Sequence, residues 1–533
     1  MVCNIGEAEL NRLVSQADPL QLSERCCFLN AALSEDLMTR SPVEVQPHFI
    51  DLVGKDPNRD EVVAELVQRR TGVVAEPTAL ATMAAFTLTC ATGTSHDVPF
   101  LKILMALNFE TLREPGTEKI RFDADSMSSA IAASATLGTE RYLNVRWRFR
   151  EFIIWSRSEE ARRHHAYVNI DEELMQAFGT TYEDLMAGLT AIDTLTDFTL
   201  IRERGRAWVS AAEILRDDRL GIIRRLLSHM SISRHNLADI VRATQLHYLR
   251  GVMHALFLRS PVVEFENERY LVPAPRLLDN AMALGWVYAL ADARAALNKK
   301  ASAQFWIFFG AFFERYIVGI LERIGRAMGM RVFPEQDLGQ FRTSDAILQS
   351  DNSIYFFEVV SSRLSANVLR DPSDDAELNR EFEQKVFGKV DQLAENIRRF
   401  YAGEFAQFGL NPDKSIAVYP VLVQYRSFLR TDAFQRTMEK RFQERLGIQA
   451  PNVRVVEILD SEILESMEEH LAADRPLGGL IDEKLGDAAT RSSLFKNFMS
   501  LRHPELPLRL PPQIAQWDRD WQGEILATVG SWR

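Results

Sequence analysis

The stretch SIYFFEVVSSRL, Ser353–Leu364, predicts a buried β-strand with a glutamate inside it. Apolar residues occupy both alternating faces of the run, which is typical of a strand that is covered on both sides. Glu358 lies in its middle, and an ionised carboxylate in a core costs free energy unless it is paired or binds a metal. The strand therefore predicts the centre of an α/β fold and a buried acid that needs a partner.

The sequence around this strand changes from helical to strand-like periodicity. Two helical segments, 277–297 and 305–328, precede the strand-like runs MRVFPE and TSDAIL. After SIYFFEVV, the polar helical segment DAELNREFEQKVFGKVDQLAENIRRFYAGE leads to two further strands, SIAVYPVLVQY and VRVVEILD. This order of elements predicts an α/β domain over residues 300–460.

The rest of the chain divides into three further regions. Residues 1–255 carry apolar residues at three- and four-residue spacing, which predicts a mostly helical N-terminal region. Residues 256–299 contain VVEF and RYLV on either side of ENE, which predicts a small β-hairpin or β-arm followed by a linker helix. Residues 461–533 are expected to form a helical C-terminal tail.

Composition and charge limit the classes of function. The chain has 533 residues and a net charge of −12, so it is not a generally basic nucleic-acid coat. Any contact with DNA or RNA needs a local basic surface or metal ions. The four cysteines lie within the first hundred residues without a CxxC pair, which indicates neither a disulfide framework nor a zinc ribbon and suits a reducing cytosol.

The most apolar segment, Phe305–Gly325, is interrupted by Glu314 and Arg315. The apolar run before them is too short to span a bilayer, so a buried core helix is expected rather than a membrane helix. The first residues lack a basic head followed by an apolar run, so no signal peptide is indicated. Together these features predict a cytoplasmic protein without a membrane partner.

Basic and aromatic residues alternate in RWRFREF, Arg146–Phe152, and His164 and His165 follow shortly after. Such a cluster contacts a phosphate backbone or stacks on bases in some proteins, but it is also typical of a helix face balanced by local acids. The sequence contains no GxxxxGK[ST], GxGxxG, HExxH or GxSxG motif. Readings as a P-loop ATPase, a Rossmann enzyme, a zinc protease or an esterase therefore lack their motifs.

Asp345 precedes Glu358 by thirteen residues, and each lies on a predicted strand. This pattern resembles the PD-(D/E)xK nuclease superfamily, in which two such acids hold Mg²⁺ and a following lysine orients or activates the attacking water. The resemblance implies a restriction-endonuclease-like fold, with a central mixed sheet flanked by helices. It also implies a Mg²⁺ or Mn²⁺ site formed by Asp345, Glu358 and Glu314, the last from the helix before the strands.

The family places its lysine two residues after the second acid, where this chain has Val360. Arg363, Lys385 and Lys389 are the candidates to replace it. Arginine stays charged and handles protons poorly, so Lys389 or Lys385 is the better replacement. Gln392 shares a helix face with both lysines, as the polar pair of family members does. The resemblance thus implies a catalytic set of five residues: Asp345, Glu358, Lys385, Lys389 and Gln392.

Two functions follow from these residues. One is a metal-dependent endonuclease or exonuclease that hydrolyses phosphodiester bonds of DNA or RNA. The other is a catalytically inactive scaffold with a nuclease fold, which binds nucleic acid, a protein partner or a second copy of itself within a bacterial multi-protein system such as phage defence. In the second case Glu358 forms a structural ion pair, and the lysines and Gln392 lie on a solvated helix face.

The space above Val360 separates these two functions. A lysine ammonium within about 4 Å of both carboxylates favours the enzyme, because charges at that distance are strongly coupled. A plug of Phe or Leu side chains in the same place favours the scaffold.

Overall fold

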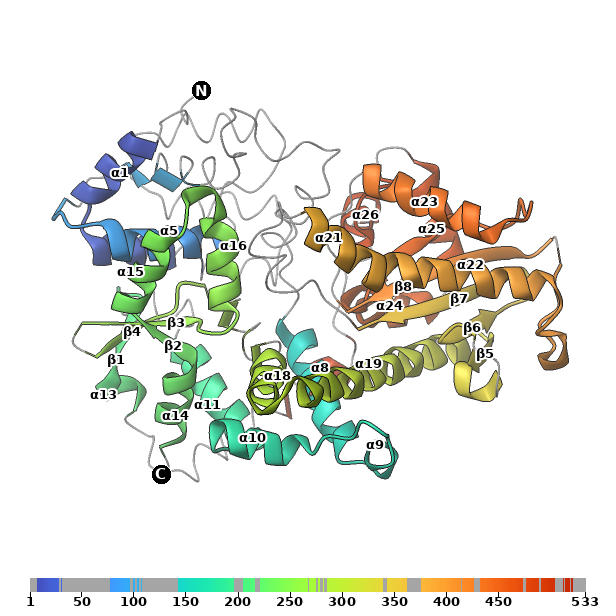
Figure 1. The fold of residues 1–533 in the computed structure, drawn as a ribbon, viewed down its shortest axis with the longest axis horizontal. Helices are drawn as coiled ribbons and strands as arrows, with labels where there is room; N and C mark the ends of the chain where they lie inside the picture. Colours follow the sequence, from blue (N-terminus) through green and yellow to red (C-terminus); the bar gives the residue numbers. More distant parts are fainter. Residues whose placement is uncertain are drawn as a thin grey trace.

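Helices make up most of the described chain in the computed structural model, and two β-sheets lie among them (Figure 1). The described residues are 7–27, 30, 77–95, 99–100, 103–104, 107, 142–195, 205–215, 221–266, 268–274, 277–278, 281, 285–338, 343–361, 375–413, 415–425, 432–472, 476–487, 490–503, 511, 513–517 and 519–520.

The first sheet is small, with the strand order β1–β4–β3–β2. Its strands are β1 Trp208–Ser210, β2 Ser231–Ser233, β3 Val262–Phe265 and β4 Arg269–Leu271. The antiparallel pair β3–β4 is the hairpin that the two apolar runs predict. β1 and β2 fall within the region predicted to be helical. Each has only three residues, too few to produce the period-two pattern by which a strand is recognised.

Helices cover this sheet on the left of Figure 1 and continue below it. α5, α15 and α16 contribute to one apolar core with the sheet residues Val263 and Leu271. The helices up to the linker have the following bounds: α1 Glu7–Gln16, α5 Pro77–Cys90, α8 Tyr142–Ser156, α9 Glu159–Arg162, α10 Ile170–Phe178, α11 Tyr182–Leu195, α13 Ala211–Ile214, α14 Ile222–Met230, α15 Arg234–Ala243, α16 Leu246–Phe257 and α18 Trp286–Leu297.

The long helix α19, Lys299–Ala327, joins the two halves of the molecule (Figure 1). Asn298 caps its start by accepting a hydrogen bond from the Ala301 N–H (2.8 Å). Phe152 of α8 packs against Phe309 and Phe312 of α19, with ring centroids 5.3 and 5.1 Å apart. By length and composition, α19 could cross a membrane, but half of its apolar window is buried in the protein. This burial fits the prediction of a core helix.

The second sheet has the strand order β5–β6–β7–β8–β9. Its strands are β5 Arg331–Pro334, β6 Ala346–Gln349, β7 Ser353–Val360, β8 Ala417–Gln424 and β9 Glu457–Asp460. The pairs β5–β6 and β6–β7 are antiparallel, whereas β7–β8 and β8–β9 are parallel. The prediction of a central mixed sheet within an α/β region is therefore confirmed, and all five strand-like runs form strands.

Helices cover both faces of this sheet. Ile354, Phe356 and Val360 of β7 pack with α22 and α23, whereas Tyr355 and Phe357 face the core shared with α19 and α24. The remaining elements are the 3₁₀ turn Glu335–Leu338, α21 Asp375–Phe382, the π turn Glu383–Phe387, α22 Gly388–Tyr401, the 3₁₀ turn Ala406–Phe408, α23 Asp432–Leu446, α24 Ser461–Ala472, α25 Leu477–Gly486 and α26 Phe495–Arg502. Glu358 thus lies on the central strand, on the face that α22 covers.

Candidate metal centre

Three acidic residues continue one row across the strands β5, β6 and β7. In this register Pro334 pairs with Ala346, and Ala346 pairs with Phe357. One position further along this row, the three strands carry acidic residues: Glu335, Asp345 and Glu358. The Glu335 N–H donates to the Asp345 carbonyl (3.2 Å), so the ladder extends by that one residue. Pairing of the strands therefore brings together acids that are far apart in the sequence.

Asp345 is buried immediately before β6, where it follows the buried residues Thr343 and Ser344. Its Oδ2 accepts a hydrogen bond from the Val359 N–H at 2.6 Å. Because a backbone donor on β7 holds this oxygen, the Asp345 carboxylate is oriented beside Glu358. The predicted pair of strand acids thus lies at one place in the structure.

Glu358 is 2% exposed, and both of its carboxylate oxygens have a donor. The Lys389 Nζ lies 2.8 Å from Oε2, and the Asn396 Nδ2 donates to Oε1 at 3.2 Å. Asn396 also donates to the Ser344 Oγ (3.1 Å), so its amide is fixed between two strands. These contacts pair a charge whose burial would otherwise be costly.

Lys389 reaches the acids from the first turn of α22. Its ammonium is 2.8 Å from Glu358 and 3.7 Å from the Asp345 Oδ2, and 29% of its side chain is exposed. Lys389 and Asn396 are seven residues apart, which places both on the helix face toward the sheet. A lysine ammonium therefore lies within about 4 Å of both strand carboxylates, the arrangement that was expected to favour an enzyme over a scaffold.

Glu314 joins the group from α19. One carboxylate oxygen from each of Glu314, Glu335 and Asp345 lies within 4.8 Å of the other two. Such a spacing suits oxygen ligands around one divalent cation. A Cβ added to Gly310, one turn before Glu314, would lie 3.1 Å from the Ser361 Oγ, so α19 passes close to the end of β7. This close passage places Glu314 near the strand acids.

The crowding of acids shifts their protonation. Burial, aided by the Asp345 charge, raises the pKa of Glu358 to about 8. Burial, aided by Asp345 and Glu335, raises the pKa of Glu314 to about 7. Burial also raises the pKa of Asp345, although Lys389 opposes this shift. One ammonium does not neutralise this much negative charge, so the cluster favours an additional proton or a metal cation.

The pKa of Lys389 is raised even though burial alone lowers it. The charges of Glu358 and Asp345 outweigh the desolvation of the ammonium, with Glu314 adding to them. Lys389 is therefore held in its charged form, which suits a group that orients a carboxylate or a phosphate.

The other predicted residues lie apart from this group. Lys385 pairs with Glu381 at 3.2 Å on its own helical segment. Gln392 is exposed, one turn before Asn396. Val360 is buried among apolar side chains of α22 and α23. Arg363 lies outside the described residues.

Two residues of the site were missed by the sequence analysis, Glu335 and Asn396. Asn396 had a signal, because it is a polar residue in the apolar stripe of α22 that also carries Leu393 and Ile397. The sequence signal for Glu335 was weaker. Glu335 directly follows the strand-like run MRVFP, and Asp345 directly precedes the next strand, so both acids lie at strand ends. Only the strand register brings Glu335 to Asp345.

The residues of the predicted basic–aromatic cluster differ in exposure, because those on α8 and those around α9 have different surroundings. Arg148 of α8 is buried and pairs with the buried Glu465 of α24 at 2.7 Å. Arg162, Arg163 and His165 remain exposed at and after α9. Any local basic surface for a phosphate backbone is therefore limited to the α9 part of the cluster.

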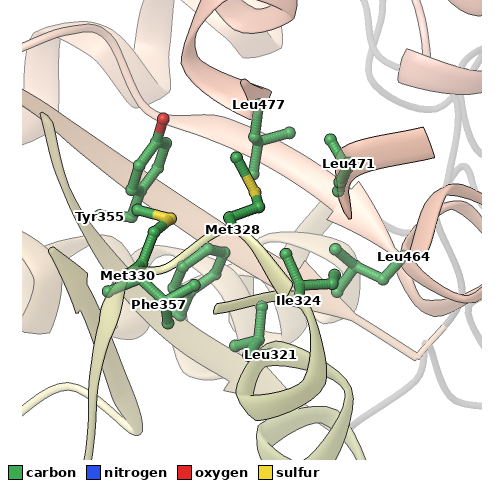
Figure 2. Close-up of a pocket in the computed structure, with 10 residues that line it drawn as sticks. Leu321, Ile324, Met328, Met330, Tyr355, Phe357, Leu464, Leu471 and Leu477 are labelled. Carbon is green, nitrogen blue, oxygen red and sulfur yellow. The ribbon is translucent and has the colours of Figure 1, made fainter. Parts of the chain in front are cut away.

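A separate apolar pocket lies on the opposite face of the sheet. Figure 2 shows Leu321 and Ile324 of α19 and Met328 directly after it around the pocket, together with Tyr355 and Phe357 of β7. No charged side chain lines it, and the Tyr355 hydroxyl accepts a hydrogen bond from the Gly478 N–H (3.0 Å). This pocket is a gap in the packing of the core and offers no group for acid–base chemistry.

Comparison of the chain with protein-family models, with curated proteins and with solved structures finds no match. The interpretation of the site therefore depends on its own chemistry.

Proposed function

We propose that the α/β region is a metal-dependent phosphodiester hydrolase of nuclease type, with a restriction-endonuclease-like arrangement of its sheet. One observation carries this proposal: the Lys389 ammonium lies 2.8 Å from Glu358 and 3.7 Å from Asp345. A helix thus supplies the cation that the strand lacks at Val360. In this proposal the Lys389 ammonium does the work of the family's lysine, from a different place in the sequence.

The donor set fits a hard divalent cation. Glu314, Glu335 and Asp345 offer three carboxylate oxygens close together, and Mg²⁺ and Mn²⁺ prefer such ligands. The predicted ligand set is changed in one member, because Glu335 takes the place expected for Glu358. When bound, the cation would neutralise charge on a phosphate and lower the pKa of a coordinated water.

The residues of the chain have separate roles in this proposal. Asn396 and Lys389 fix the Glu358 carboxylate, which in turn holds the ammonium beside Asp345. Because 29% of the Lys389 side chain is exposed, its ammonium can also contact a phosphate oxygen or a water that enters from solvent. The lysine thus orients the attacking group, as expected from the resemblance.

A specific observation favours the alternative of an inactive scaffold. Both Glu358 oxygens already have partners, and Val360 packs within an apolar cluster that includes Phe382 and Phe387. In a scaffold the ion pair would be structural, and the region would bind nucleic acid or a protein partner without cutting it. The two functions differ in whether a divalent cation binds beside the pair.

Calorimetric titration with Mn²⁺, followed by incubation of the metal-loaded protein with labelled DNA and RNA, tests the proposal. We expect binding and cleavage in the natural protein, and loss of both in Asp345→Asn. Lys389→Met should keep most of the metal affinity but lose about 10²- to 10³-fold in rate, as expected when a charged group that stabilises the developing negative charge is removed. Glu395→Gln on the exposed side of α22 is the matched control.

Metal binding that is equally strong in Asp345→Asn would contradict the proposed ligands. Protein that binds no Mn²⁺ and cuts no substrate would favour the scaffold. Cleavage that persists in Lys389→Met would remove the lysine from the mechanism.

A further inference from the structure

Arg441 of α23 makes one of the densest sets of side-chain hydrogen bonds in the α/β region. Its Nε and one terminal nitrogen donate to the two oxygens of Asp391, at 2.9 and 2.8 Å. The other terminal nitrogen donates to both oxygens of Glu383, at 2.8 and 2.7 Å. The guanidinium also lies over the Phe387 ring, 5.3 Å from its centroid. A planar fork that grips two carboxylates restrains geometry as well as charge.

The three residues that Arg441 contacts enclose the π turn. Glu383 and Phe387 are its first and last residues, and Asp391 lies in the first turn of α22. A π turn takes one extra residue into the helix. Asp391 is eight positions after Glu383. Because the π turn between them takes up one extra residue, these eight positions span about two helical turns, as seven positions do in an α-helix, and the two side chains lie on one face. In an unbroken α-helix the two would differ by about 80°.

Lys389 lies between the π turn and Asp391. Lys389 shares a face with Asn396, seven positions further on, only because the chain from one to the other is α-helical. If the extra residue moved two turns toward the C-terminus, it would fall after both Lys389 and Asp391, and Glu383 and Asp391 would no longer lie on the one face that Arg441 contacts. The lysine would then rotate by about 100° relative to Asn396, the angle of one residue in an α-helix. Its ammonium would leave Glu358 and Asp345.

We propose that Arg441 is a positioning residue that holds the π turn in register and thereby keeps the Lys389 ammonium between Glu358 and Asp345. A catalytic consequence of this restraint rests on the proposed hydrolase function. The geometric part concerns only Arg441, the π turn and Lys389, and it is tested without any substrate.

The test measures how fast Lys389 is acetylated by an N-hydroxysuccinimide ester, by mass spectrometry of peptides from the full-length protein. In the natural protein we expect slow acetylation, because the ammonium is ion-paired. In Arg441→Leu we expect Lys389 to react at least fivefold faster, while the exposed Lys440 on α23, which pairs with Glu444, keeps its rate as an internal standard. Arg445→Leu, one turn further along α23 and exposed, is the matched control and should leave Lys389 slow.

Arg441→Lys separates charge from geometry. Because one ammonium lacks the guanidinium fork, we expect this variant to leave Lys389 reactive, although it keeps the positive charge. If Arg441→Leu does not fold, Glu383→Gln replaces it, and a rise of about twofold at Lys389 is expected. A change of less than 1.5-fold at Lys389 in the folded variant would overturn the proposal.

The outcome does not depend on the proposed activity. If the natural protein neither binds Mn²⁺ nor cleaves nucleic acid, the hydrolase proposal fails while the acetylation result still decides the role of Arg441. If cleavage is found and Lys389 stays protected in Arg441→Leu, the hydrolase proposal stands and the positioning role fails.

Discussion

Two strands of the same sheet each pair a glutamate with a lysine from a neighbouring helix. On β7, Glu358 meets Lys389 of α22 at 2.8 Å. On β9, Glu457 meets Lys484 of α25 at 3.1 Å, and both of those side chains are fully buried. In contrast, 29% of the Lys389 side chain is exposed. The fully buried pair Glu457–Lys484 is therefore an example of a structural ion pair in the same sheet, and the pair Glu358–Lys389 can be compared with it.

The two pairs differ in what surrounds the lysine. Lys484 also donates to the Arg491 carbonyl at 2.9 Å, so a main-chain acceptor helps to satisfy its ammonium inside the core. Lys389 instead lies near a second carboxylate, that of Asp345, and Glu314 and Glu335 lie beside Asp345. A dry pair with a backbone acceptor suits stability, whereas a partly open pair with excess negative charge suits the binding of a cation.

The largest expected effect is on stability, and it distinguishes the pairs directly. Lys484→Met should destabilise the sheet by about 3–5 kcal/mol, because it leaves a carboxylate in the core without its cation. Lys389→Met should cost less, about 1–3 kcal/mol near neutral pH, because the buried Glu358 loses one donor but can take up a proton. Urea unfolding followed by hydrogen exchange of β7 and β9 peptides measures both. Equal losses would mean that both pairs are structural.

A metal titration should affect the two pairs differently. At a Mn²⁺ concentration about 100 times its Kd, we expect the natural protein to gain about 2.7 kcal/mol of stability. Asp345→Asn should gain nothing, whereas Glu457→Gln should keep the full increment even though its starting stability is lower. Thermal unfolding with and without Mn²⁺ measures this increment. An equal increment in Asp345→Asn would place the ion elsewhere.

The pH dependence of stability follows from the raised pKa of Glu358. Its folded pKa of about 8 exceeds the ordinary 4.5, so the folded protein holds a proton that the unfolded chain releases. This stabilisation is fully present below about pH 4.5 and is lost as the pH rises through about 8. Asp345, Glu314, Glu335 and Lys389 face the same carboxyl, and their coupling reduces the expected loss to about 2 kcal/mol.

Urea unfolding at pH 5.5, 7.0 and 8.5 measures this loss. Glu358→Gln should reduce the dependence, because an amide keeps the hydrogen bond from Asn396 but does not titrate in this range. Part of the dependence should remain, since Glu314 has a pKa raised to about 7. A natural protein that is equally stable at all three pH values would contradict the raised pKa.

Much of the sheet was predictable because its two central strands, β7 and β8, are apolar runs of eight residues each. The turn at Ser350–Ser353 is centred midway between Asp345 and Glu358, and the Ser350 N–H donates to the Ser353 carbonyl (2.8 Å). An antiparallel hairpin about that centre places the two acids opposite each other, so their spacing of thirteen residues carried structural information. The short strands β1 and β2 could not be predicted in this way, because three residues are too few to show the period-two alternation of a strand.

The lysine could not be assigned in the same way. In an unbroken helix, Lys385, Lys389, Gln392 and Asn396 would all share one face, since they are four, three and four residues apart. The π turn ends at Phe387 and turns Lys385 away from the face by which Lys389 and Asn396 contact Glu358, while Gln392 points to solvent. A π turn depends on tertiary contacts such as those of Arg441, and these contacts have no local sequence signal.

Substitutions of Lys385 and Gln392 are expected to have the smallest effects on stability and on Mn²⁺ affinity. Such small effects would limit the site to Lys389 and Asn396 of α22. Gln392→Ala should change stability by no more than about 0.5 kcal/mol, because Gln392 is exposed. Lys385→Met should cost about 1 kcal/mol, because the half-buried Lys385 pairs with Glu381, but it should leave Mn²⁺ affinity unchanged. Asn396→Ala should cost about 1–3 kcal/mol, because it leaves a buried Glu358 oxygen without its donor. Urea unfolding and Mn²⁺ titration of the three variants measure both properties. A loss of Mn²⁺ affinity in Lys385→Met would extend the site across the π turn and remove the distinction between the two lysines.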